Sequence, residues 1–132
     1  MMRLLRVAPV LLVRDVEAAV AFWHDRVGFE TDLIHGDPPN FAMPTRDDVT
    51  LMLVQVPAGT EVPAPHWRVV EKVNQAYIWV DDVDALYEEL GSRGAPIDFT
   101  IYDTPWGTRE FGIQDLDEHD VAFGQVVARP TP

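Results

Sequence analysis

The sequence contains four histidines, the side chains best suited to hold a metal or move a proton near neutral pH: His24, His35, His66 and His119. No two of them form an HxH or HxxxH pair, the spacings that place two imidazoles on one face of a strand or a helix. We therefore expect ordinary surface or loop histidines. His66 lies beside Trp67 and Arg68, and of the four it is the one expected to reach a ligand.

Nucleophilic and acid–base catalysis both lack suitable residues. Cysteine is absent, which excludes thiol nucleophiles, disulfides and zinc–thiolate sites. Ser92 is the only serine, and its GSRG context is typical of a turn. The adjacent carboxylates are expected in a turn, at a helix cap and on a solvated helix face: Asp47-Asp48, Asp81-Asp82 and Glu88-Glu89. The sequence therefore predicts no catalytic residue.

Aromatic residues carry a stronger signal for ligand binding. They lie on or next to predicted strands and loops: Phe41, Trp67, Trp79, Tyr102, Trp106 and Phe111. Such rings can stack on a flat ligand and attract a cation through their π faces. Trp106, between Pro105 and Gly107, is expected to contact a ligand, whereas Trp79 and Phe111 are expected to pack in the core. Arg109 and Glu110 could orient a ligand or pair across the strands, and both readings stay open.

Charge and hydropathy restrict the partners. The 132 residues include 22 acidic and 10 basic side chains, a net charge of −12, which would repel nucleic acid and attract a cationic small molecule. The alternative is that the acidity serves solubility alone. No apolar run reaches the roughly 18 residues of a membrane span. The apolar N-terminus is broken by Arg6 and Pro9 and lacks a cleavage site, so we expect a cytoplasmic protein without a membrane partner.

The elements that must position these residues follow an internal repeat. Residues 7–29 read VAPVLLVRDVEAAVAFWHDRVGF, and residues 74–94 read NQAYIWVDDVDALYEELGSRG. The copies align on VRDVEA and VDDVDA, so Asp15 and Asp82 occupy equivalent positions about half the chain apart. Each copy predicts a buried strand, a helix capped by the Asp carboxylate, and a glycine stop.

Further strands complete each half. In the first half we expect strands at residues 4–13, 29–34, 41–43 and 49–56, with a helix after Asp15 whose buried stripe is Val16, Ala19, Val20, Trp23 and Val27. Residues 57–73 contain three prolines and form a linker. In the second half we expect strands at residues 74–80, 97–102, 109–113 and 121–127. The sequence thus predicts one domain, residues 1–132, with module 1 at about residues 4–56 and module 2 at about residues 74–127.

This duplicated pattern resembles the vicinal oxygen chelate superfamily of glyoxalases, bleomycin-resistance proteins and dioxygenases. The segments that carry the resemblance are PVLLVRDVEAAVAFWHDRVGF, RDDVTL and PWGTREFGIQDLDEHD, which are most similar to the bleomycin-resistance branch. The resemblance implies an α+β fold of two tandem βαβββ modules forming a curved, half-open mixed sheet. It also implies a homodimer whose concave sheets form two shared clefts. In the DLDEH turn, Glu118 replaces the family's glycine, a position that often needs positive φ.

The resemblance also implies where a metal would be held. Enzymes of this superfamily bind a divalent ion on the concave surface through His, Gln and Glu side chains. Three of the four ligand positions correspond to Ala8, Gln75 and Ala122, and the fourth falls within residues 50–52, Thr-Leu-Met. Gln75 alone cannot hold a metal. We therefore expect no metal and no cofactor, which favours a binding protein over an enzyme.

The expected function is binding of a small organic ligand that is cationic or aromatic. Similarity to the bleomycin-resistance branch implies that Phe41 and Trp106 stack on it. The predicted ligand-binding set comprises eight residues: Phe41, Met52, His66, Trp67, Gln75, Tyr102, Trp106 and Arg109. We expect metal-free sequestration of a bleomycin-like antibiotic or another DNA-damaging metabolite. Two alternatives stay open: a glyoxalase- or dioxygenase-type metalloenzyme with an atypical site, and a binder of an unrelated host metabolite.

Overall fold

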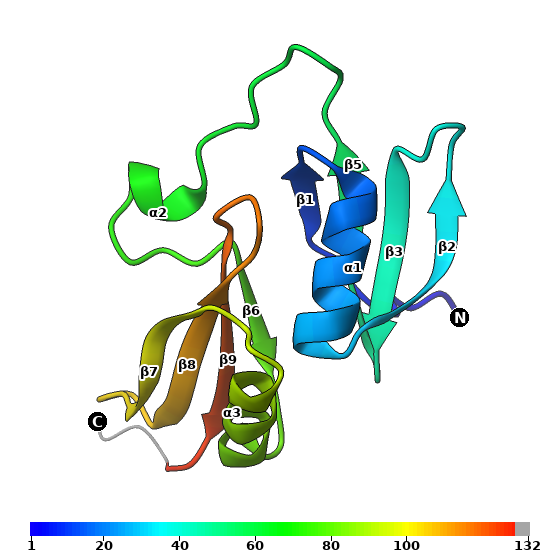
Figure 1. The fold of residues 1–132 in the computed structure, drawn as a ribbon. Helices are drawn as coiled ribbons and strands as arrows, with labels where there is room; N and C mark the ends of the chain where they lie inside the picture. Colours follow the sequence, from blue (N-terminus) through cyan, green and yellow to red (C-terminus); the bar gives the residue numbers. More distant parts are fainter. Residues whose placement is uncertain (129–132) are drawn as a thin grey trace.

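The computed structural model describes residues 1–128, which form two halves joined by a long linker (Figure 1). The first half contains β1 (Val10–Val13), α1 (Val16–Val27), β2 (Glu30–His35), β3 (Phe41–Arg46), β4 (Val49–Thr50) and β5 (Met52–Gln55). The linker carries one short helix, α2 (His66–Val69). The second half contains β6 (Ala76–Trp79), α3 (Val83–Ser92), β7 (Ile97–Asp103), β8 (Thr108–Gln114) and β9 (Asp120–Val126). Within these 128 residues, no helix is both long and apolar enough to cross a bilayer.

Each half forms its own open sheet of mixed strand direction. The strand order is β1-β5-β3-β2 in the first sheet, where β4 also pairs with β3, and β6-β9-β8-β7 in the second. The β1–β5 and β6–β9 pairs are parallel, and the remaining pairs are antiparallel. This arrangement confirms the predicted α+β fold with two tandem modules.

The two main helices begin in the same way. Asp15 caps α1 by accepting a hydrogen bond from the backbone N–H of Ala18, and Asp82 caps α3 through Ala85. A glutamine at the end of each module satisfies a second helix-start amide, because Gln55 Oε1 accepts from the Val16 N–H and Gln125 Oε1 from the Val83 N–H, both at 2.9 Å. The internal repeat therefore extends to both capping groups.

One helix covers one face of each sheet. Figure 1 shows α1 in front of the first sheet and α3 in front of the second. The core fills the space between each helix and its sheet, and its largest fully buried side chains include Trp23, Phe111, Leu11, Leu51, Leu53, Leu90 and Ile113. The prediction that Phe111 is a core residue is confirmed. Because successive strand residues point to opposite faces, every second residue of each strand faces away from the helix.

Three predicted elements differ from the structure. The first strand begins at Val10, and the exposed Leu4 and Leu5 precede it because no described strand pairs with that segment. The strand predicted at residues 49–56 is divided at Leu51, a fully buried residue whose N–H bonds to the Pro44 carbonyl. The linker contains α2, whose four residues are too short for a helical period to be seen among the prolines.

Polar side chains join the two modules. Arg46 of β3 makes a two-point ion pair with Glu89 of α3, with N···O distances of 2.7 and 2.8 Å. Arg26 of α1 donates to the backbone carbonyl of Arg93 at 2.9 Å. Arg46 and Arg93 lower the pKa of Glu89 to about 2, since both guanidiniums stabilise its charged form.

Candidate ligand-binding site

The face of the second sheet that points away from α3 is rich in aromatic side chains. Phe111, Ile113, Val121 and Phe123 face the core, so their neighbours in β8 and β9 face away from it: Glu110, Gly112, Ala122 and Gly124. Tyr77 and Trp79 of β6 and Phe99 and Tyr102 of β7 flank these central residues. We call the eight residues Tyr77, Trp79, Phe99, Tyr102, Glu110, Gly112, Ala122 and Gly124 the aromatic face.

Two glycines allow the rings to lie flat on this surface. A Cβ atom at Gly124 would overlap the Tyr77 hydroxyl, and one at Gly112 would overlap the Phe99 ring. Neither glycine adopts positive φ, so their role is close approach and not a special backbone conformation. The two glycines therefore leave space above the central strands, and Tyr77 of β6 and Phe99 of β7 extend into it.

Glu110 is the polar centre of the aromatic face and is only 6% exposed. Its Oε2 accepts hydrogen bonds from the hydroxyls of Tyr77 at 2.6 Å and Thr108 at 3.2 Å, whereas Oε1 receives one long contact from Tyr102 at 3.4 Å. Burial, followed by the bond to Glu110, raises the pKa of Tyr77 to about 12. Burial and the same carboxylate raise the pKa of Tyr102. Both phenols therefore stay protonated and donate to Glu110 at neutral pH.

A second acidic residue lies at the start of β9. Asp120 is almost fully buried, and its Oδ1 has no hydrogen-bond partner among residues 1–128. Asp120 is paired in register with Gln114, whose amide donates to Asp98 at 3.2 Å. Burial, reinforced by the Asp98 carboxyl, raises the pKa of Asp120 to about 7. This carboxyl group therefore titrates near neutral pH.

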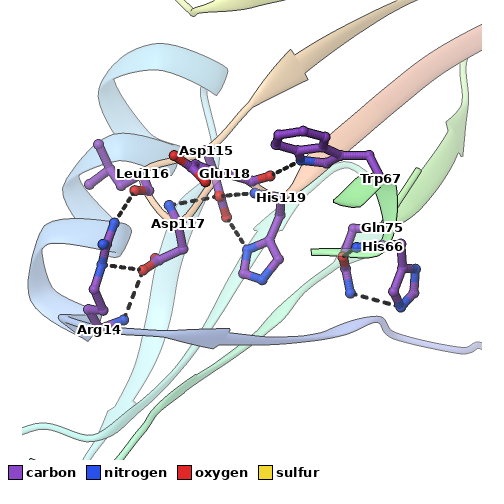
Figure 2. A network of polar contacts seen from close by, with 9 residues as sticks. All are labelled: Arg14, His66, Trp67, Gln75, Asp115, Leu116, Asp117, Glu118 and His119. Atoms are coloured by element: carbon purple, nitrogen blue, oxygen red, sulfur yellow. Dashed lines mark hydrogen bonds and ion pairs between the residues drawn. The ribbon is translucent and has the colours of Figure 1, made fainter. Parts of the chain in front are cut away.

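The turn between β8 and β9 is held by its own side chains (Figure 2). Asp115 Oδ1 accepts from the backbone N–H groups of Asp117 and His119, and Oδ2 lies 2.7 Å from His119 Nδ1. His119 is 3% exposed, so the expectation of a surface or loop histidine is wrong in one respect: it lies in the turn but is buried. The bond to Asp115, four residues earlier, explains the burial because it gives the Nδ1 atom of His119 a hydrogen-bond partner.

The same turn ties the first module and the linker to the second module. Asp117 accepts from the backbone N–H and the Nε of Arg14, at 3.1 and 3.0 Å, and Arg14 also donates to the Leu116 carbonyl. The indole N–H of Trp67 donates to the Glu118 carbonyl at 2.7 Å (Figure 2). The Arg14 bonds hold the first module beside the turn, and the Trp67 bond holds α2 there.

The residues at the implied metal positions do not fit a metal ion. Ala8 and Ala122 offer only methyl groups, and Met52 is a soft ligand unsuited to a hard divalent ion. Gln75 Oε1 already accepts from the His66 backbone N–H at 3.1 Å, and its Nε2 lies 3.2 Å from His66 Nε2 (Figure 2). In the part of the chain that the structure describes, no three His, Cys, Asp or Glu side chains are grouped to hold a metal.

The structure distributes the eight predicted ligand-binding residues over several surfaces. Tyr102 belongs to the aromatic face, and Gln75 directly precedes β6 on the same side. Phe41 and Met52 are half-buried on the helix-free face of the first sheet, where Met52 is paired with Val10. The remaining four lie elsewhere: His66 and Trp67 on α2, Trp106 in the β7–β8 turn, and Arg109 on the helix side of β8.

Two of these residues differ in how free they are to contact a ligand. The Trp106 residue is 56% exposed. Arg109 forms ion pairs with Asp103 at 2.7 Å and with Asp84 of α3 at 2.9 Å. The cross-strand pairing considered for Arg109 is therefore present, and its contact with a ligand stays a prediction.

The sequence interpretation missed residues of the aromatic face. Trp79 was expected in the core, yet it is 63% exposed and packs against Tyr77, with ring centroids 4.8 Å apart. Tyr77 was not singled out. The period-two pattern of Gln75, Tyr77 and Trp79 opposite the buried Ile78 is the signal that could have placed them together.

A cavity between the two modules shares only Trp79 with the aromatic face. It has a volume of about 450 Å³, and its walls include Phe29, Arg46, Val80, Leu86 and Glu89. None of the eight predicted residues lines it, and the Arg46–Glu89 ion pair contributes to its wall. Its lining is typical of a module junction, so the aromatic face is the stronger candidate for ligand recognition.

Comparisons with known proteins agree with this architecture. Residues 3–123 match the family described as the Glyoxalase/Bleomycin resistance protein/Dioxygenase superfamily. Comparison with curated protein sequences returned no significant match.

Solved structures with the same fold include proteins that bind antibiotics. The bleomycin-binding protein of bleomycin-producing Streptomyces verticillus, in complex with copper(II)-bleomycin, is 30% identical, with a TM-score of 0.67 over 98% of this chain and 100% of that chain. TnmS3, an antibiotic binding protein from Streptomyces sp. CB03234, is 22% identical, with a TM-score of 0.67 over 95% and 99% of the two chains. TioX from Micromonospora sp. ML1 is 23% identical, with a TM-score of 0.70 over 92% and 100%. The chain belongs to the Glyoxalase/Bleomycin resistance protein/Dioxygenase superfamily.

Proposed function

We propose that this protein binds a small organic molecule, a bleomycin-like antibiotic or another DNA-damaging metabolite, and sequesters it in a stoichiometric complex. The observation that carries the proposal is the aromatic face, where Trp79 and Tyr102 stay exposed on a sheet surface that no helix within residues 1–128 covers. Exposed rings on an ordered sheet provide stacking area at little cost in side-chain entropy.

Two further observations support this function over metal-dependent catalysis. The bleomycin-binding protein of Streptomyces verticillus is similar over nearly the whole chain. The implied metal positions are occupied by residues that do not fit a divalent ion, so the proposed mechanism contains no metal-dependent step. Sequestration needs no chemical step, because holding the molecule away from DNA is sufficient. A net charge of −12 would also repel DNA from the complex.

The proposal includes a homodimer in which ligand contacts come from two chains. Phe41 and Met52 lie on the first sheet, and Tyr102 and Gln75 lie on the second. If the helix-free faces of two chains oppose each other, residues from both sheets would line each of two clefts. Trp106 would contribute from the turn between β7 and β8.

The first experiment is a titration of metal-stripped protein with metal-free bleomycin, followed by tryptophan fluorescence and isothermal titration calorimetry. The expected result is saturation at one bleomycin per chain, with unchanged bleomycin recovered and identified by mass spectrometry. A flat titration would exclude bleomycin as the ligand. Conversion of bleomycin to a product would contradict sequestration.

Trp106→Ala provides the matching variant. Because Trp106 is more than half exposed, its removal should leave the melting temperature within about 2 °C of the original. The dissociation constant for bleomycin is expected to rise more than tenfold, as is typical of a lost aromatic anchor. An unchanged dissociation constant would remove Trp106 from the binding site.

A further inference from the structure

We propose that the aromatic face recognises a positively charged organic group of its ligand, such as an ammonium, with Glu110 as the counter-charge. This inference rests on the proposed function, and of the cationic and aromatic ligands expected from the sequence it selects the cationic class. It assigns the central role to a residue outside the eight predicted from the sequence.

Glu110 is as buried as a core residue, yet it has no charged partner among residues 1–128. A buried carboxylate is costly unless a cation or several hydrogen bonds compensate it. Among residues 1–128, no Arg, Lys or His forms an ion pair with Glu110. The compensation comes from the neutral hydroxyls of Tyr77, Thr108 and Tyr102, which leaves the negative charge of the site uncancelled.

The neighbouring arginine cannot take the role of partner. Arg109 precedes Glu110 in β8 and therefore points to the opposite face of the sheet. Its guanidinium is occupied by Asp103 and Asp84 on the side of α3. Arg109 is therefore next to Glu110 in the sequence, but the alternation of side chains along β8 directs its guanidinium to the other face of the sheet.

The two oxygens of Glu110 are satisfied unequally. Oε2 accepts two hydrogen bonds, of 2.6 and 3.2 Å, while Oε1 has only the 3.4 Å contact from the Tyr102 hydroxyl. A carboxylate can accept about four hydrogen bonds, so Oε1 retains capacity for a ligand donor or charge. A small rotation of the exposed Tyr102 would open that oxygen further.

The surrounding rings suit a cation better than an anion or a purely apolar group. Trp79 and Tyr102 occupy the same row of the sheet as Glu110, on either side of it, because Trp79 pairs with Gly124, Gly124 with Glu110, and Glu110 with Tyr102. The negative π faces of these rings add to the attraction of the carboxylate. A net charge of −12 raises the rate at which a cation arrives.

The test uses two probes of similar size in an NMR titration of the isotope-labelled full chain at low ionic strength. Benzyltrimethylammonium carries a fixed positive charge, and N-benzylacetamide is its neutral counterpart. Benzyltrimethylammonium is expected to bind saturably and to shift the amide signals of Glu110, Gly124 and their neighbours. N-benzylacetamide is expected to bind at least tenfold more weakly. This comparison needs no variant.

Glu110→Gln removes the charge and keeps the shape of the side chain. Its dissociation constant for benzyltrimethylammonium is expected to rise more than tenfold. Glu88→Gln is the matched control, because it makes the same change in net charge at an exposed position of α3 and should alter the dissociation constant less than twofold. Equal affinity for the two probes, no saturable binding of the cation, or an unchanged constant in Glu110→Gln would each overturn the inference.

The bleomycin titration separates this inference from the proposed function. Saturable bleomycin binding together with Glu110-independent binding of the probe would retain the proposed function and remove the cation site. Glu110-dependent binding of the probe without bleomycin binding would retain the cation site and redirect the search to other cationic ligands.

Discussion

At the scale of single residues, Glu118 is held in a conformation that favours glycine. Its φ is 66°, and its backbone carbonyl accepts the Trp67 indole N–H. The left-handed conformation costs a residue with a Cβ atom roughly 1–2 kcal/mol. The Glu118 side chain forms an ion pair with Arg68, and an exposed pair of this kind returns at most about 1 kcal/mol. The cost of the left-handed backbone at Glu118 is therefore offset in part by its side-chain contact to Arg68 of α2.

Two substitutions at this position separate the backbone from the charge. Glu118→Gln removes the ion pair and keeps the backbone strain, whereas Glu118→Gly removes both. We expect the free energy of unfolding of Glu118→Gly to exceed that of Glu118→Gln by roughly 1 kcal/mol, measured by urea denaturation. Equal stabilities would show that the turn imposes no strain.

Asp120 gives a second residue-scale prediction, in the dependence of stability on pH. Its pKa is about 7 in the folded protein and about 4 when exposed, so the folded state binds a proton that the unfolded state releases between these values. The stabilising contribution is complete below about pH 4 and is lost as pH rises through 7.

Asp120→Asn should remove this loss, because an amide carries no charge at any of these pH values. At pH 8 we expect the free energy of unfolding of the variant, measured by urea denaturation, to exceed that of the original protein by roughly 1–2 kcal/mol. At pH 5 this difference should be smaller. The other carboxylates are common to both proteins and cancel in the comparison. A difference that is the same at both pH values would contradict the assignment.

At the scale of elements, the second sheet shows which parts of the fold the sequence could predict. The Asp15 and Asp82 caps were predicted because a carboxylate before an apolar stripe is a local signal. The exposure of Trp79 was not, since an aromatic residue in mid-strand has the same local context whichever face it occupies. The face to which the Trp79 side chain points depends on which side of the sheet α3 covers. That is decided by contacts between residues far apart in the sequence. The ligand contacts of Phe41 and Trp106 remain predictions.

Glycines within the elements provide a matched pair of substitutions. Gly112 of β8 lies under the Phe99 ring, whereas a Cβ added at Gly91 of α3 would meet no atom of the described chain within 4 Å beyond its own helix backbone and neighbours. Gly112→Ala should lower the free energy of unfolding by about 1–3 kcal/mol, because Phe99 must move. Gly91→Ala should raise it by roughly 0.5–1 kcal/mol, because alanine favours the helix.

Thermal denaturation followed by circular dichroism would measure both variants. Opposite signs are expected although the chemical change is the same. A stabilising Gly112→Ala would mean that the second sheet tolerates a Cβ there, and that the flat packing of Phe99 does not depend on glycine.

At the scale of the whole molecule, exposed apolar side chains favour association of two chains. Val10 is exposed on the helix-free face of the first sheet, and Leu4, Leu5 and Val7 are exposed before it. Several apolar residues exposed close together in sequence are typical of an interface. We predict that sedimentation equilibrium will give twice the mass of the chain.

A charged residue at the predicted interface should weaken this association. Val10→Lys is expected to shift the protein toward monomer at micromolar concentration. Val69→Lys is the control, because Val69 is also exposed but lies on the linker helix α2. A single chain at all concentrations, or the same shift in both variants, would count against a dimer built on the first sheet.

The paired capping groups have a consequence for the origin of the chain. Each helix receives its Asp cap and its glutamine partner from within its own module, and none from the other. An ancestral polypeptide of half the present length would already have encoded a complete strand–helix–sheet unit. Joining two such units would require only a connecting segment, and contacts such as Arg14–Asp117 and Arg46–Glu89 then hold the two modules together.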